Sequence, residues 1–547
     1  MNEVALSATV RTAAATLATV TAVVLVEFAL VGPDEIARLT PADFLRIPVD
    51  GLVAAAVVLA LPGRARLLVA AALGVLLGLL TVLKIVDMGF YVFLDRPFNP
   101  TSDWGYFRSA SDLLSLAIGR RDANLSVVAA VVLATLVMVF LPLSVLWLTR
   151  VASRHRAASL RLVAALGVVS LVGAAVGVHV GSGQSMASTD AAGLLVDEVR
   201  QIHAGIDDRQ TLLREAADDP FRTTPRADLL TGLRGKDVVI AFVESYGKVA
   251  VHGSSFSPRV DALLRNGTRR LQAAGFASRS AFLTSPTFGG ISWLAHSTLQ
   301  SGLWIDNQHT YDDLVTTARF TLSDAFKRAG WRTVADVPSN EKDWPEGRSF
   351  YHYDQIYDDH NVGYQGPSFS YASMPDQYTL SALHRLELAR PDRTPVMAEV
   401  DLVSSHIPWA PLPRMVDWRR VGDGSIFDAM PAQGQSPTWV WRSADRVRAA
   451  YGHSVEYTLR SLMSFLRTYP AKNLVLIVLG DHQPSTMVTG QGQSHDVPVS
   501  VIARDPAVMR GVSGWHWQRG MLPGANAPVW PMSAFRDRFL TAFDAEH

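Results

Sequence analysis

Carboxylate and imidazole side chains follow two apolar stretches of this sequence, and proteins use these side chains to bind divalent cations. Glu244 comes directly after residues 238–243, and Asp481 and His482 come just after residues 474–479. A single carboxylate in such a place is usually a turn former or a helix cap. Several carboxylates at one edge of a sheet, however, repel one another and raise each other's pKa unless a cation lies between them. We therefore predict that Glu244, Asp481 and His482 bind a metal ion.

A hydroxyl that could act as a nucleophile lies at the predicted start of a short helix. Residues 284–291 contain two glycines and indicate a loop, and we expect a helix from about Ser292 to the pair Ser301-Gly302. The free amide groups at a helix N-terminus favour an alkoxide and bind a phosphate or sulfate beside it. A coordinated cation would lower the pKa of the hydroxyl further. The alternative is that Ser292 only caps the helix, a role that serine also fills well.

Three more polar residues lie near other apolar runs. Asp401 lies within residues 396–403 and His406 follows them, whereas His495 comes before residues 497–502. Each of the three alone could be part of the scaffold. If they gather at the same sheet edge as Glu244, they become candidates for binding a metal ion or a substrate.

The elements that must position these residues are the apolar runs themselves. Runs 238–243, 396–403, 474–479 and 497–502 have the length of strands and are separated by helical patterns. Because they are continuous rather than alternating, they indicate strands buried on both faces, which is typical of an α/β domain with a largely parallel sheet. Ligands of such sheets bind beyond the carboxyl ends of the strands.

The composition excludes several classes of protein. The 547 residues include 50 Lys and Arg and 50 Asp and Glu, so neither a basic nucleic-acid binder nor an acidic solvating chain is expected. The absence of cysteine excludes disulfides, cysteine metal ligands and a thiol nucleophile. Only 18% of the residues are charged, below the roughly 25% of soluble domains, and the mean hydropathy is +0.15. Part of the chain is therefore expected in a membrane.

Five apolar stretches before residue 182 approach the roughly 20 residues that cross a bilayer. They are residues 12–31, 48–61, 67–86, 125–148 and 160–180. The second is short and ends at Pro62-Gly63, so a re-entrant or tilted element is the alternative to a full span. We predict a transmembrane domain over residues 1–182, a linker with a juxtamembrane helix over 183–224, and a catalytic α/β domain over 225–547.

The orientation follows from the basic residues of the short loops, which stay in the cytoplasm. Residues 63–66 and 150–161 are rich in arginine, whereas residues 33–46 and 87–122 have no excess of positive charge. We therefore predict a multi-pass cell-membrane protein with a cytoplasmic N-terminus and, after five crossings, an extracytoplasmic catalytic domain. The outer loop 89–122 is rich in aromatic residues, which is typical of an interfacial belt, and a platform for a lipid substrate is the alternative.

Residues 237–502 resemble the alkaline phosphatase/sulfatase superfamily, and the five-span anchor resembles its membrane-bound branch of lipoteichoic acid synthases and phosphoethanolamine transferases. The resemblance rests on Phe242-Val243-Glu244-Ser245-Tyr246 for the first metal-binding carboxylate and on Leu479-Gly480-Asp481-His482 for an Asp-His ligand pair. The family's nucleophile lies nine residues before the hydroxyl residue of a Ser-Gly or Thr-Gly pair, and counting back from Ser301 gives Ser292. Because that branch generally uses threonine, Thr287 is a second candidate.

The resemblance also implies further site residues. His406 lies in a stretch similar to the loop that contacts phosphoglycerol in lipoteichoic acid synthases. In two-metal members of the superfamily, an Asp and two His residues at the positions of Asp401, His406 and His495 bind a second metal ion. Here the spacing from Asp401 to His406 is one residue longer than usual, so we expect a single tightly bound metal ion. Trp344 and Arg348 resemble a substrate-binding stretch of lipoteichoic acid synthases.

The function implied by the resemblance is metal-dependent transfer of a phospho-alcohol headgroup, phosphoglycerol or phosphoethanolamine, from a membrane phospholipid to an envelope glycan or lipid acceptor. Ser292 would form the covalent intermediate and bind the cation together with Glu244, Asp481 and His482, and histidine ligation favours Mn²⁺ or Zn²⁺ over Mg²⁺. A phosphodiesterase or sulfatase-type hydrolase is the main alternative, although residues 293–296 lack the Pro and Arg of the sulfatase maturation motif. A non-catalytic membrane scaffold on the same fold is a third hypothesis. No nucleic-acid partner is expected, and the sequence leaves the oligomeric state open.

Overall fold

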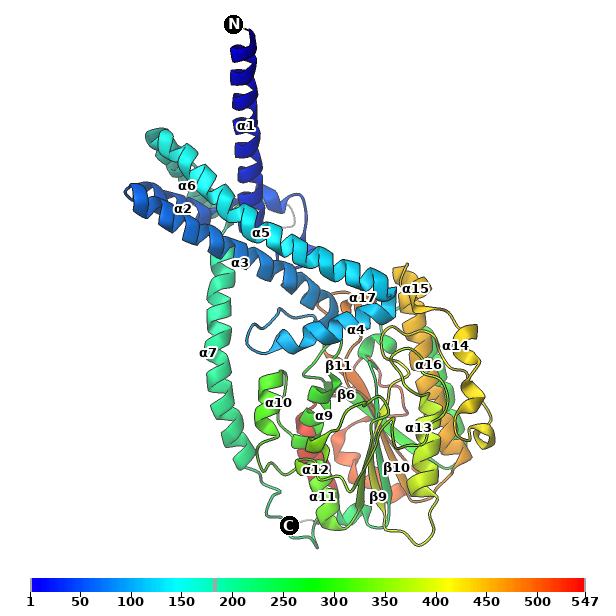
Figure 1. Cartoon of the computed structure of the whole chain (residues 1–547). Helices are drawn as coiled ribbons and strands as arrows, with labels where there is room; N and C mark the ends of the chain where they lie inside the picture. The colour runs from blue at the N-terminus through cyan, green and yellow to red at the C-terminus, as the bar shows by residue number, and fades with distance from the viewer. Residues whose placement is uncertain (1, 181–183, 546–547) are drawn as a thin grey trace. The chain divides into compact units, whose positions relative to one another are not determined.

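The computed structural model describes residues 2–180 and 184–545, which form two compact units (Figure 1). The first unit comprises Met1–Val92, Arg96–Thr101 and Asn124–Gly205, and the second comprises Phe93–Asp95, Ser102–Ala123 and Ile206–His547. The boundary after Gly205 falls inside the predicted linker. Residues 102–123, which the sequence analysis assigned to the transmembrane domain, belong to the second unit.

Long apolar helices make up most of the first unit. Those long and apolar enough to cross a membrane are α1 (Asn2–Val31), α3 (Gly63–Leu94), α5 (Arg120–Arg154) and α6 (Arg156–Val176). The second predicted span, residues 48–61, is α2 (Val49–Ala60), whose 12 residues cover only about 18 Å of a hydrocarbon core of about 30 Å. The structure therefore has four helices of spanning length, not five, among the described residues. The predicted orientation needs α2 as a further crossing and stays a prediction.

Two predicted loops of the membrane domain are mostly helical. Arg64 and Arg66 lie in the first turn of α3, and α5 and α6 are separated by His155 alone. The outer stretch 89–122 begins with the end of α3 and then forms α4 (Tyr106–Ile118). Helix α7 (Asp190–Ala217) lies in the region for which a linker helix was predicted.

Polar contacts and small residues join the helices of the first unit. The Lys84 ammonium group in α3 donates to the carbonyl oxygens of Ala29 (3.1 Å) and Gly32 (2.8 Å) and so caps the carboxyl end of α1. A Cβ atom at Gly74 would lie 2.7 Å from the Cα atom of Pro142, so this glycine allows α3 and α5 to pack closely. Two short strand pairs lie near the helix ends. They are β1 (Ile47–Pro48) with β4 (Ala187–Ser188), and β2 (His179–Val180) with β3 (Gln184–Ser185).

A nine-stranded sheet forms the centre of the second unit. Its parallel part has the order β10 (Leu474–Gly480), β5 (Asp237–Val243), β9 (Val396–Leu402), β7 (Arg332–Asp336) and β8 (Gln355–Tyr357). On the other side of β10 lie β11 (Asp496–Ala503) and β6 (Ala277–Thr284), followed by β12 (Gln518–Arg519) and β13 (Val529–Pro531). The predicted largely parallel α/β sheet is confirmed, with β11 antiparallel to both of its neighbours.

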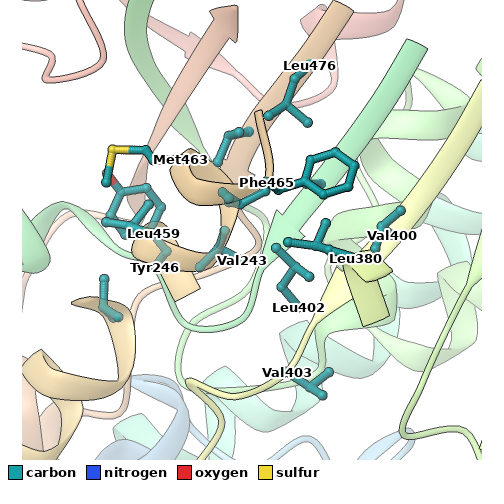
Figure 2. Close-up of a cluster of buried hydrophobic side chains, with 14 of the residues drawn as sticks. Val243, Tyr246, Leu380, Val400, Leu402, Val403, Leu459, Met463, Phe465 and Leu476 are labelled. Atoms are coloured by element: carbon teal, nitrogen blue, oxygen red, sulfur yellow. The ribbon is translucent and has the colours of Figure 1, made fainter. Parts of the chain in front are cut away.

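Both faces of the sheet are buried, as the continuous apolar runs indicate. Along β5, Val239, Ala241 and Val243 belong to one hydrophobic cluster, and Val238, Ile240 and Phe242 belong to the other. In the first cluster, strand residues such as Val243 and Leu402 pack with Leu380 and Leu459 from the covering helices (Figure 2). The alternation along β5 therefore places Phe242 under one helical layer and Val243 under the other.

Helices cover each face of this sheet. The first cluster includes residues of α8 (Ser257–Ala273), α13 (Asp376–Leu383) and α16 (Ala444–Thr468), and the second includes residues of α9 (Ser292–Ser301), α11 (Leu322–Ala329), α18 (Pro506–Gly511) and α19 (Ala534–Phe543). Shorter helices are α10 (Gln308–Leu314), α12 (Pro345–Ser349), α14 (Met430–Gln433), α15 (Pro437–Val440) and α17 (Thr486–Thr489). Helix α4 packs against α15 within this unit.

Candidate active site

The end of β5 is a sharp turn that holds the first carboxylate. The backbone N–H of Glu244 donates to the carbonyl oxygen of Leu402 on β9 (3.1 Å). Ser245 has a φ of 57°, in the left-handed region that non-glycine residues seldom adopt. Its backbone N–H donates to Asp481 Oδ1 (2.8 Å), and its hydroxyl donates to Glu244 Oε1 (2.7 Å). Strained backbone of this kind is concentrated at functional sites.

Gly480 allows the end of β10 to approach the end of β5. A Cβ atom at this position would lie 2.0 Å from the carbonyl oxygen of Tyr246, so close packing requires the glycine. Asp481 follows at once, and its Oδ1 accepts the N–H groups of Ser245 (2.8 Å) and His482 (2.7 Å). These bonds fix Asp481 beside Glu244.

Ser292 is the first residue of α9, and its hydroxyl points to the same place. Ser292 Oγ lies 3.0 Å from Glu244 Oε2 and 3.2 Å from His482 Nε2. The N-cap position of α9 belongs to Ile291, with a φ of 66°, and makes no side-chain cap. The alternative role of Ser292 as a mere helix cap is therefore wrong, because its hydroxyl contacts the predicted metal ligands instead.

The second candidate nucleophile, Thr287, is buried and has no hydrogen-bond partner for its Oγ1 among the described residues. Its backbone N–H donates to the hydroxyl of Ser285 (3.3 Å), which belongs to the loop before α9. Because Ser292, and not Thr287, hydrogen-bonds to Glu244 and His482, the geometry favours Ser292 over Thr287.

Glu244, Asp481 and His482 have the spacing of a cation site. One ligand atom from each lies within 4.8 Å of the others, and all three residues are buried. His482 Nε2 lies 3.5 Å from Glu244 Oε1 and 3.6 Å from Asp481 Oδ2. His482 Nδ1 lies 2.7 Å from the carbonyl oxygen of Gln483, which can only accept, so Nδ1 carries the proton and Nε2 offers its lone pair to the site.

The electrostatics of the pair Glu244 and Asp481 agree with this geometry. Burial and the charge of Glu244 raise the pKa of Asp481 to about 7. Burial acts in the same direction on Glu244, but His406 and His482 outweigh it and lower its pKa. Two carboxylates this close disfavour each other's ionised form, a conflict that a divalent cation relieves. The residues fit the metal ion that the sequence resemblance implies.

His406 and His495 lie near this cluster but not within its hydrogen bonds. The ring of His406 stacks on Tyr371 with ring centroids 3.4 Å apart, and its Nδ1 lies 2.5 Å from the carbonyl oxygen of Ile407. The ring of His495 lies 5.2 Å from that of Phe288. Burial lowers the pKa of both histidines. β11 runs antiparallel to its neighbours, which explains why His495 precedes its strand and still reaches the same sheet edge.

Asp401 lies beside His296, which also contacts Glu399, and the sequence analysis singled out neither His296 nor Glu399. His296 Nδ1 lies 2.9 Å from Glu399 Oε1 and 3.5 Å from Asp401 Oδ1. Burial lowers the pKa of His296, but Asp401 and Glu399 outweigh it and raise this pKa to about 9. Within the described chain, the predicted second-metal set of Asp401, His406 and His495 does not form a group with metal-binding distances, whereas Asp401, His296 and Glu399 do.

Two signals in the sequence could have found these residues. His296 lies four residues after Ser292, so both face the same side of α9. Glu399 and Asp401 are the two acidic residues of a mostly apolar strand, where burial of a charge demands a partner.

Trp344 and Arg348 lie on either side of the start of α12. The ring of Trp344 packs 5.3 Å from that of Tyr351 and 6.1 Å from that of Tyr353, at the edge of the second hydrophobic cluster. Arg348 is exposed and forms no ion pair with any described residue. The structure shows no contact between either residue and Ser292, so their substrate-binding role stays a prediction.

Comparison with solved structures returns proteins of the kind that the sequence motifs resemble. The phosphoethanolamine transferase EptA from Neisseria meningitidis, an integral membrane protein, is 12% identical over 92% of this chain and 87% of its own, with a TM-score of 0.46. The lipoteichoic acid synthase LtaP from Listeria monocytogenes is 13% identical over 58% of this chain and 74% of its own, with a TM-score of 0.37. The phosphoglycerol transferase GacH from Streptococcus pyogenes is 14% identical over 63% of this chain and 82% of its own, with a TM-score of 0.37. No protein-family model and no curated protein matches the sequence.

Proposed function

We propose that this protein is a metal-dependent membrane transferase that moves phosphoglycerol or phosphoethanolamine from a phospholipid to an envelope glycan or lipid through a covalent adduct on Ser292. The observation that supports it most directly is the place of Ser292 Oγ, at the N-terminus of α9 and within 3.2 Å of both Glu244 Oε2 and His482 Nε2. The membrane-spanning helices of the same chain suit a lipid donor. The activities named for the structural neighbours are of this type.

The chain's own residues account for the steps. Ser292 Oγ loses its proton and attacks phosphorus, the bond between phosphorus and the lipid oxygen breaks, and that oxygen takes up one proton as diacylglycerol leaves, so that no net proton is gained or lost. The first amide groups of α9 favour the anionic phosphoryl group beside Ser292. The hydroxyl of the acceptor then attacks the phosphoserine, and Ser292 is regenerated. A divalent cation held by Glu244, Asp481, His482 and Ser292 would stabilise the serine alkoxide and the charge on phosphorus-bound oxygens.

The remaining predicted residues are proposed to contact the substrate. The charge of His406 lowers the pKa of Glu244, so the two side chains interact. His406 can therefore hold a phosphate oxygen or protonate a leaving group. His495, Asp401, Trp344 and Arg348 are proposed for more distant parts of the substrates. We propose a single metal ion, with Mn²⁺ or Zn²⁺ favoured and Mg²⁺ as the alternative, and an extracytoplasmic position for the second unit.

The test is to map the covalent adduct. The full chain in detergent is incubated with Mn²⁺ and mixed vesicles of phosphatidylglycerol and phosphatidylethanolamine, and its peptides are analysed by mass spectrometry. We expect a phosphoglycerol or phosphoethanolamine adduct on Ser292, absent from Ser292→Ala and retained in Thr287→Ala. The mass of the adduct identifies the donor.

Other outcomes identify the alternatives. A metal-loaded protein that forms no adduct and leaves both lipids intact would point to a hydrolase of other esters. A correctly folded protein that binds no metal ion would point to the non-catalytic scaffold.

A further inference from the structure

His296 lies one helical turn after Ser292 and is held in a fixed orientation. Side chains four residues apart share a helix face, and the Cα–Cβ bonds of a helix tilt toward its N-terminus, so His296 leans toward the turn that carries Ser292. Its ring stacks on that of Phe242, with centroids 3.7 Å apart and planes 16° apart. Phe242 lies two residues before Glu244 on β5. The imidazole therefore lies between the nucleophile helix and the strand that leads to the metal-binding carboxylate.

Glu399 fixes the other side of the ring. Its Oε1 accepts the hydrogen bond from His296 Nδ1 (2.9 Å), and its Oε2 accepts from the hydroxyl of Tyr353 (2.9 Å) and from the amide of Gln300. Gln300 is held in turn by the backbone N–H of Ser323 (2.9 Å). Glu399 is buried, and both of its oxygens have donors, so it cannot turn away from His296 without losing bonds in a site that excludes water.

These contacts leave the second nitrogen of His296 available. With two carboxylates at its Nδ1 edge, the imidazole is held in its charged form, in which Nε2 also carries a proton. No described residue accepts a hydrogen bond from Nε2, and this atom is not among the buried atoms without partners, so it is open to solvent. The site thus contains an oriented N–H donor that no contact within the described protein uses.

We propose that His296 is a further phosphate-binding residue, whose Nε2–H donates a hydrogen bond to a non-bridging oxygen of the phosphoryl group at Ser292, and that Glu399 is the positioning residue that holds its ring. This inference rests on the proposed role of Ser292. A phosphodiester is anionic, and hydrogen bonds from a charged donor to such an oxygen are about twice as strong as neutral ones. His296 would therefore strengthen the binding of substrate and of the charge that develops during transfer.

The same three residues, His296, Glu399 and Asp401, have distances that could also suit a cation. The hydrogen bonds argue against one. Nδ1 directs its proton at Glu399 Oε1, and Glu399 Oε2 is occupied by two donors, so a cation would displace bonds that are already satisfied. The experiment below separates the two hypotheses.

Three substitutions of His296 divide its structural role from its role at Nε2. In His296→Asn the amide overlaps the position of Nδ1 and keeps a donor for Glu399, but nothing remains at Nε2. In His296→Gln the amide reaches the position of Nε2 and keeps an uncharged donor there. His296→Ala removes both, and His516→Asn makes the same chemical change, as a control, at an exposed histidine outside the groups with metal-binding distances.

The primary readout is the affinity of the Mn²⁺-loaded full chain for inorganic phosphate, measured by calorimetry, with Mn²⁺ per chain and the thermal midpoint measured in parallel. We expect His296→Asn to weaken phosphate binding by about 10- to 100-fold, with one Mn²⁺ per chain and a wild-type thermal midpoint. His296→Gln should recover most of that loss, and Glu399→Gln should weaken binding less than His296→Asn does.

Three results would overturn the inference. Equal phosphate affinity in His296→Asn and wild type would show that Nε2 binds no phosphate. Equal losses in His296→Asn and His296→Gln would show that the donor at Nε2 is irrelevant. A fall from two Mn²⁺ ions to one in His296→Asn would make the cluster a cation site. A missing lipid adduct on Ser292, by contrast, counts against the proposed function and leaves the phosphate measurement to decide the role of His296.

Discussion

Three backbone positions explain why the site residues converge. Ser245 and Ile291 have positive φ angles of 57° and 66°, and each bends the backbone where the chain reaches the site. Gly480 is needed for a different reason, because the carbonyl oxygen of Tyr246 occupies the space of its missing Cβ. Side chains alone therefore do not define this site, since the backbone at the ends of β5 and β10 brings Glu244 and Asp481 together.

Gly480→Ala should destabilise the second unit. The added Cβ would lie 2.0 Å from Tyr246 O, so the ends of β5 and β10 must move apart, and overpacking of this kind costs about 1–3 kcal/mol. We expect a lower midpoint of chemical unfolding in detergent. Gly514→Ala is the matched control, because nothing lies within 4 Å of its Cβ position. Equal midpoints for the two variants would contradict the close approach described here.

Removal of metal should also lower stability. A cation that binds only the folded state at 100 times its dissociation constant adds about 2.7 kcal/mol to the free energy of unfolding. We expect a chelator to lower the thermal midpoint of the wild-type chain and to have little effect on Glu244→Gln, which lacks one of the ligands. A midpoint of the wild type that does not respond to the chelator would count against the cation site.

At the scale of elements, Asp376 joins three parts of the second unit. It begins α13, its Oδ1 accepts the backbone N–H of Ser404 after β9 (2.9 Å), and its Oδ2 accepts the hydroxyl of Thr458 on α16 (2.5 Å). Burial raises its pKa to about 6, although these hydrogen bonds act in the opposite direction. The helices that cover one face of the sheet thus depend on a carboxyl group that is most stable when protonated.

The folded-state pKa of Asp376 is above the unfolded value of about 3.9, so the protonated group stabilises the fold below about pH 4 and this contribution is lost as the pH rises through about 6. In Asp376→Asn, whose amide can donate to Thr458, this part of the pH dependence should disappear. We expect the difference in free energy of unfolding between the variant and the wild type to increase from pH 4 to pH 7. A difference that is constant over this range would show that Asp376 is already ionised in the fold.

The sequence predicts the strands that are buried on both faces better than the others. The sequence pattern identifies four strands, β5, β9, β10 and β11, because both faces of each strand are buried and require apolar residues. β6 was missed because it contains Ser278, Arg279 and Ser280, and β7 and β8 are short. The ligands Glu244, Asp481 and His482 follow predicted strands directly, whereas His296 and Glu399 come together only through the register that places Glu399 beside Ile240 of β5.

At the scale of the whole molecule, the second unit is not continuous in sequence. Residues 102–123, with α4, and residues 206–547 belong to one compact unit, and α5 and α6 lie between them in the chain. Parts of one folded unit must be on the same side of a membrane, so α5 and α6 together cross it an even number of times. We predict that each helix crosses the membrane once, which would put His155, between the two helices, on the opposite side.

The absence of cysteine in the native chain makes this topology easy to test. Three single substitutions introduce a cysteine at an exposed position. They are Ser109→Cys on α4, Ser513→Cys after α18 and His155→Cys between α5 and α6. With a membrane-impermeant maleimide on intact cells, we expect the first two to be labelled and His155→Cys to be labelled only after permeabilisation. Labelling of Ser109→Cys and Ser513→Cys from different sides would contradict a shared unit.

The membership of α4 in the second unit also limits how this protein can be shed from a cell. A protease that cuts once within residues 183–224 separates the chain after the cut from the membrane helices before it. Helix α4, however, stays joined to α3 and α5. The released fragment would leave behind α4, the helix that packs against α15. Release of the second unit together with α4 therefore requires two further cuts, one between α3 and α4 and one between α4 and α5.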